Sequence, residues 1–167
     1  MYNQDIENKK HIENIYTEKA IKFLKTCVAI FTFNLLTYLF TLLVYSAFDF
    51  GLIFEIISLT FVILALNKVS QKNFIYAKKY IVIAMIPIGC LIIYDFINLL
   101  VNIKEVFNEI ALYYTTMDRY FYLLAPYLVD ITLIAIIILL YKTLSFVNIA
   151  SGTEKATTYA DRFYDEL

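Results

Sequence analysis

The sequence predicts an all-α fold: a polytopic integral membrane protein whose four transmembrane helices form a bundle with short amphipathic interfacial helices. Apolar residues make up 61% of the 167-residue chain, and its mean hydropathy is +0.69. The charged residues are clustered, so that no residue between Lys25 and Asp49 carries a charge. Three further apolar windows contain one carboxylate each. These windows approach or exceed the ~20 residues that a helix needs to cross a hydrocarbon core.

Four uncharged or nearly uncharged runs define the expected spans at about 23–48, 51–67, 80–103 and 120–142. The spans belong to one membrane domain, residues 23–148. It is flanked by an N-terminal amphipathic segment, residues 1–22, and a C-terminal tail, residues 149–167. These polar flanks are too short to bury a core of their own. The second span is the shortest, and it follows the first after Asp49 and Phe50, which predicts a tight hairpin.

The distribution of basic residues predicts the orientation. Twelve of the 14 lysines and arginines lie in the N-terminal segment, the loop between the second and third spans, and the C-terminal segment. Only Lys104 and Arg119 lie in the other two loops. Because cytoplasmic loops are enriched in Lys and Arg, both termini are expected in the cytoplasm. The abundance of Ile, Asn, Lys and Tyr suggests an AT-rich genome and a bacterial cytoplasmic membrane.

Two loop segments have apolar residues at helical spacing. The segment 103–114 is amphipathic and either lies on the membrane or extends the third span outward; the interfacial helix is slightly favoured. The N-terminal segment repeats the pattern more weakly and predicts an inner-surface helix that runs into the first span. Ser151, Gly152 and Thr153 predict a helix stop. The residues beyond are expected to be either a partner-binding tail or a disordered end.

Three carboxylates lie inside the expected spans, namely Glu55, Asp95 and Asp130, and no Lys or Arg lies deep enough in a span to pair with them. Each costs roughly 2.5–3.5 kcal/mol at the centre of a membrane helix, so such groups normally face a bundle interior or a wet cavity. Counting about 1.5 Å per residue from the expected outer edges gives depths of about 6 Å for Glu55, 12 Å for Asp95 and 15 Å for Asp130. Asp130 is therefore the deepest and the favoured functional residue.

Neutral polar residues recur near the acids at helical spacing, which predicts a shared polar interior. The supporting residues are Asn34, Tyr38 and Thr41 on the first span, Asn98 on the third and Tyr127 on the fourth. Two interpretations stay open. The three acids bind a proton or a monovalent cation that enters from outside, or they are protonated or hydrogen-bonded contacts between helices.

Pro87 and Gly89 lie in the third span. Proline cannot donate its backbone hydrogen bond, so a kink is expected there, either static or a gating hinge. Cys27 and Cys90 are expected to be small buried apolar residues at depths too different for a disulfide.

Several function classes are excluded by composition. With 14 basic and 15 acidic residues the chain has no global field to attract nucleic acid. The single histidine, His11, lies in the polar N-terminal segment, and no Gly-rich phosphate loop or Cys-x-x-Cys motif is present. We therefore expect no enzyme, no metal and no cofactor.

The expected function is that of an accessory, assembly or regulatory subunit in the membrane, with the lipid bilayer and either a second copy or another membrane protein as partners. The alternative is a proton- or cation-coupled transporter or channel component that uses Asp130, Asp95 and Glu55. Four helices leave little room for a pathway, so this alternative predicts a homo-oligomer.

Overall fold

The computed structural model describes the backbone of residues 2–45, 50–112 and 117–152, and the side chains of residues 7–40, 42–44, 50–98, 100–101 and 129–152. The described chain is helical apart from short turns, which confirms the all-α class. Four helices follow one another: α1 (Tyr2–Tyr45), α2 (Gly51–Ser70), α3 (Phe74–Leu112) and α4 (Met117–Ala150). Each contains a stretch long and apolar enough to cross a membrane.

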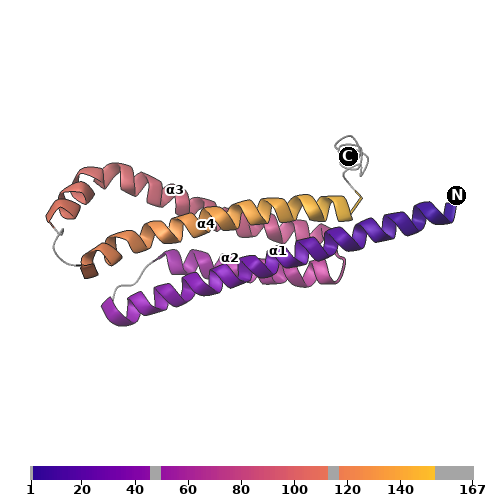
Figure 1. Cartoon of the computed structure of the whole chain (residues 1–167), viewed down its shortest axis with the longest axis horizontal. Coiled ribbons are helices and arrows are strands. Elements are labelled where there is room, and N and C mark those ends of the chain that lie inside the picture. The colour runs from indigo at the N-terminus through magenta and orange to yellow at the C-terminus, as the bar shows by residue number, and fades with distance from the viewer. Residues whose placement is uncertain (1, 46–49, 113–116, 153–167) are drawn as a thin grey trace.

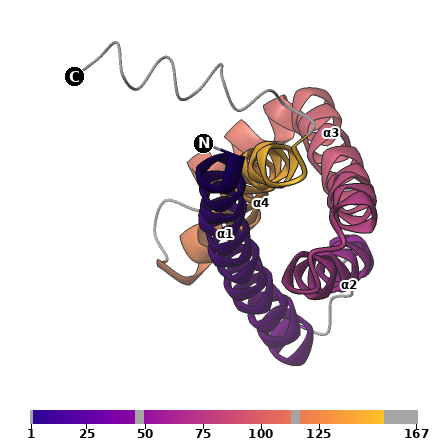
Figure 2. The same ribbon diagram turned by 90° about the vertical axis from the view of Figure 1, so that its right-hand side faces the viewer.

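The helices form a four-membered bundle in which sequence neighbours are also neighbours in space (Figure 1). The helix α1 packs on α2, α2 on α3 and α3 on α4, and α4 closes the ring by packing on α1 (Figure 2). Short connections make the consecutive helices antiparallel. The start of α1, the α2–α3 turn and the end of α4 therefore lie at one end, which we call the basic end because most of the lysines lie there.

Polar contacts tie the segments of the basic end together. The Lys72 ammonium, in the α2–α3 turn, lies 2.8 Å from Glu13 Oε1 and 2.9 Å from Asn14 Oδ1 on α1. Lys78 on α3 donates to Ser151 Oγ after α4, at 2.7 Å. Lys72 adopts a left-handed backbone (φ 55°), and its N–H donates to the carbonyl of Val69, so that α2 ends there. Gly152, with φ 69°, ends α4 in the same way, which confirms the predicted stop.

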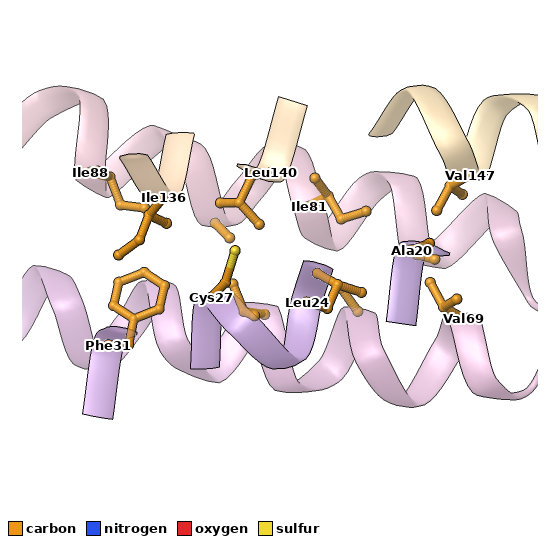
Figure 3. Close-up of a cluster of buried hydrophobic side chains, with 14 of the residues drawn as sticks. Ala20, Leu24, Cys27, Phe31, Val69, Ile81, Ile88, Ile136, Leu140 and Val147 are labelled. Carbon is orange, nitrogen blue, oxygen red and sulfur yellow. The ribbon is translucent and has the colours of Figure 1, made fainter. Parts of the chain in front are cut away.

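Buried positions recur along every helix with alternating steps of three and four residues. On α1 they are Thr17, Ala20, Leu24, Cys27, Phe31 and Asn34, and on α2 they are Gly51, Glu55, Ser58, Val62, Ala65 and Val69. A strict seven-residue repeat of this kind is typical of left-handed helical bundles. From Ala20 to Phe31 the interior is mostly apolar, and side chains from all four helices point toward one another there (Figure 3).

The helices are longer than the expected spans. The helix α1 includes the N-terminal segment and continues straight beyond the basic end of the bundle instead of bending along a surface (Figure 1). Of the two alternatives for residues 103–114, the structure fits the extension of the third span over 103–112, because α3 runs without interruption to Leu112. Helix continuation keeps the backbone hydrogen bonds of this amphipathic stretch satisfied without a new helix start. The tail, residues 153–167, lies outside the described part of the chain.

Pro87 lies inside α3, and the helix continues on both sides of it. Figure 1 shows α3 arching in its second half, toward Leu112. A Cβ atom added at Gly89 would meet nothing within 4 Å, so packing does not demand glycine there. Cys27 is buried as expected, whereas Cys90 is exposed, because α3 turns Ile88 and Leu91 inward and Cys90 outward. Both cysteines are free thiols.

Phe31 and Phe33 provide a test of the interior. Phe31 is fully buried and Phe33 is 65% exposed on the opposite side of the same helix. Replacing Phe31 with Ala leaves a cavity, and such changes cost about 3–5 kcal/mol in protein cores. We expect Phe31→Ala to lower the free energy of unfolding, measured by SDS titration in mixed micelles, by several times more than Phe33→Ala. Equal effects of the two substitutions would contradict the packing described here.

Candidate functional site

The most deeply buried polar cluster joins three helices around Glu55. The Asn34 side-chain amide on α1 donates to Glu55 Oε1 on α2, at 3.2 Å. The Thr132 hydroxyl on α4 lies 3.0 Å from Asn34 Oδ1 and 2.7 Å from the carbonyl oxygen of Val129. Glu55 is 0% exposed and Asn34 is 1% exposed. One asparagine therefore connects the carboxyl group on α2 with the hydroxyl group on α4.

Ser58 belongs to the same buried face of α2. It follows Glu55 by three residues, so the two side chains lie one turn apart on one side of the helix. Ser58 is completely buried, and its hydroxyl oxygen has no hydrogen-bond partner in the described part of the chain. A buried hydroxyl of this kind carries a desolvation cost of about 1–3 kcal/mol unless water or an ion meets it.

A second pair of acids joins the other two helices. The side chains of Asp95 on α3 and Asp130 on α4 are neighbours. Both are half-buried. Two carboxylates this close repel each other when both are ionised, so such a pair favours a bound proton or a bound cation.

The two groups form a single polar layer that crosses the bundle. Asp130 and Thr132 are two residues apart on α4, which is about 3 Å along the helix axis. From α4 the layer reaches α3 through Asp130 and α1 through Thr132, and from α1 it reaches α2 through Asn34. Every helix of the bundle thus contributes at least one polar side chain at this level.

The lysines of the basic end give the height of this layer. At about 1.5 Å per residue, Asn34 stands about 14 Å above Lys25, Thr132 about 15 Å above Lys142, and Glu55 about 20 Å above Lys68. A hydrocarbon core is about 30 Å thick. Relative to these lysines, the Glu55 cluster therefore lies near the middle of the apolar thickness. Below it the interior is mostly apolar, and the buried Thr143 hydroxyl bonds the Leu139 carbonyl of its own helix, so packed side chains separate the layer from the basic end.

The three predicted acids lie at nearly one level of the bundle, and not in the predicted series of increasing depth. Spacing along the spans predicts Glu55 near an outer mouth and Asp130 as the deepest group. In the structure the Glu55 carboxyl group is the fully buried one, and Asp130 is half-buried at nearly the level of Thr132, which belongs to the Glu55 cluster. The estimate fails because it counts from assumed membrane edges, whereas the helices continue past those edges and their mutual register decides which residues meet.

The supporting residues divide into three groups. Asn34 lies in the cluster, and Tyr38 on α1 and Asn98 on α3 each have an interaction partner. The side chains of Thr41 and Tyr127 lie outside the described residues. Thr132 belongs to the cluster although its pattern did not single it out. The sequence signal for Thr132 was its closeness to Asp130. Two residues apart on a helix, the two side chains point to different sides, so Thr132 can meet a different neighbouring helix.

The chemistry of the layer is that of oxygen and amide groups. Carboxyl, hydroxyl and amide oxygens suit protons, water and hard cations. Over the described residues there is no group of three or more His, Cys, Asp or Glu that fits a metal ion. Comparison of the chain with models of protein families, with curated proteins and with solved structures finds no match.

The bond between Asn34 and Thr132 can be measured by a double-mutant cycle with Asn34→Ala and Thr132→Val. Hydrogen bonds between membrane helices contribute about 0.6 kcal/mol on average and up to about 1.7 kcal/mol. We expect a coupling energy in this range for unfolding by SDS. The control pairs Asn34→Ala with Thr60→Val, because the exposed Thr60 hydroxyl bonds the carbonyl of Ile56 on its own helix. Additivity in both cycles would argue against the bond across helices.

Proposed function

We propose that this chain is a small accessory, assembly or regulatory subunit of the cell (cytoplasmic) membrane, with its partner at a helix surface and not within the bundle. The observation that carries the proposal is the arrangement of polar and apolar side chains in the bundle interior. Asn34 bonds both Glu55 and Thr132 across helices, and the interior below them is filled mostly with apolar side chains. Polar groups arranged in this way fix the register of a bundle, as buried polar residues do in coiled coils.

The outer surface supports the same proposal. Large apolar side chains are exposed on all four helices, among them Leu43, Ile63, Val101 and Ile138. Such a surface suits lipid or the helices of another membrane protein. A closed interior combined with an apolar exterior favours a chain that acts through association, either with a second copy or with a larger membrane protein.

A second function has one specific observation in its favour. Asp95 on α3 and Asp130 on α4 are neighbouring, half-buried acids. Acids in membrane segments often mark proton or ion pathways. A proton- or cation-coupled transporter or channel component would use this pair together with Glu55, and it would need an oligomer to form a pathway.

Ion flux into proteoliposomes separates the two functions. For a subunit, we expect purified wild-type protein to conduct neither protons nor monovalent cations above the level of empty liposomes. Asp130→Asn would instead alter stability or assembly, because it replaces one carboxyl group of the Asp95 pair. Flux through wild-type protein that Asp130→Asn abolishes, with unfolding in detergent nearly unchanged, would favour transport.

The orientation is tested by cysteine labelling. The basic segments meet at one end of the bundle, and we propose that this end faces the cytoplasm because cytoplasmic loops are rich in Lys and Arg. In a background with Cys27 and Cys90 replaced by Ala, a Lys68→Cys variant is expected to react with a membrane-impermeant maleimide only after the cells are opened. Labelling of Lys68→Cys from outside intact cells would reverse the topology.

A further inference from the structure

An open depression lies on the exposed side of α1 near the basic end. The described residues that line it are Glu18, Ile21, Lys22, Lys25, Thr26 and Ala29. These positions recur at three and four residues, so they share one face of the helix, away from the buried stripe that contains Leu24 and Cys27. The depression is therefore a feature of the outer surface of the bundle and is separate from the polar layer.

The charges at this depression favour an anion. Lys22 and Lys25 are both exposed, and they are one turn apart. Among the side chains that the structure describes, no ion pair joins Lys22 or Lys25 to an acid, whereas Lys72 pairs with Glu13. Glu18 is the one acid of the lining, and it leaves an excess of one positive charge.

An apolar track continues from the depression along the same face of α1. Ala29 is small and exposed, and it is followed by Phe33 and Leu36, which are 65% and 60% exposed. The methyl group of Ala29 leaves space between the bulkier side chains of Lys25 and Phe33. The two lysines thus stand at the end of an apolar surface that is about three turns long.

The lysines also lie at the level expected for lipid headgroups. Figure 3 shows Cys27 and Leu140 side by side in the core, and Lys25 and Lys142 each lie two residues nearer to the basic end. No basic residue follows Lys25 along α1. This level is therefore the last basic level on α1 before the apolar thickness begins.

We propose that the depression binds one anionic phospholipid, with the phosphate between Lys22 and Lys25 and an acyl chain along Ala29, Phe33 and Leu36. The proposal requires that the chain spans a membrane, and it is independent of whether the protein is a subunit or a transporter. Anionic lipid phosphates are attracted to basic residues at the membrane surface, and Lys and Arg there contribute about a fivefold preference each.

Native mass spectrometry of the full chain released from detergent micelles measures this preference, with phosphatidylglycerol and phosphatidylcholine of identical acyl chains as the probes. We expect Lys22→Gln with Lys25→Gln to raise the Kd of the first phosphatidylglycerol about 30-fold and to leave phosphatidylcholine unchanged. Lys9→Gln with Lys10→Gln is the matched control, because these exposed lysines of α1 carry the same charge and lie outside the depression.

A second variant tests the cavity without changing the charge. Ala29→Leu fills the space beside Lys25 on an exposed face, so the fold is retained, and the variant is expected to raise the Kd for phosphatidylglycerol at least fivefold. The proposal is overturned if Lys9→Gln with Lys10→Gln weakens binding as much as the Lys22 and Lys25 changes do, since the attraction would then be diffuse. It is equally overturned if Ala29→Leu has no effect, or if glycerol 3-phosphate binds as well as the lipid.

Discussion

In hydrocarbon a polar side chain has no water to bond, and this constraint explains the arrangement around Glu55. Its carboxyl group is completely buried, and the Asn34 amide donates to it from the neighbouring helix. Thr132 then meets the other end of the same amide, so three helices are held at one height. A slip of one helix by a single turn would separate these groups by about 5.4 Å and leave them unsatisfied. The apolar seams below them have no comparable preference for one register.

Most of the fold was predictable from the sequence because the signals are local. Uncharged runs locate the spans, and Gly152 marks the end of α4, where a left-handed residue is needed. The helix ends were less predictable. Charged residues suggest where a membrane ends, but a helix ends where its backbone hydrogen bonds stop, so α3 continues to Leu112 through an amphipathic stretch. The seven-residue alternation of inward positions is visible in the sequence once the bundle geometry is known.

The residues of the candidate site were easier to predict from the sequence than the contacts between them. The sequence singles out Asn34, Glu55, Asp95 and Asp130 because each is a costly residue in an apolar window. It does not say that Asn34 bonds Glu55 and that Asp95 lies beside Asp130, because these contacts depend on how the helices are aligned with one another. Thr132 was missed for a related reason: threonine hydroxyls usually bond a carbonyl of their own helix, as Thr60 does, and are poor indicators of contacts between helices.

The ring of sequence-adjacent, antiparallel helices sets an order for biosynthesis (Figure 2). Domains generally form from the N-terminus as the chain is synthesised, so the hairpin of α1 and α2 is complete before α4 exists. That hairpin already contains both Asn34 and Glu55, so the Asn34 amide can donate to the Glu55 carboxyl group before α3 and α4 are made. Contacts between α1 and α4 can form only after α4 has been made.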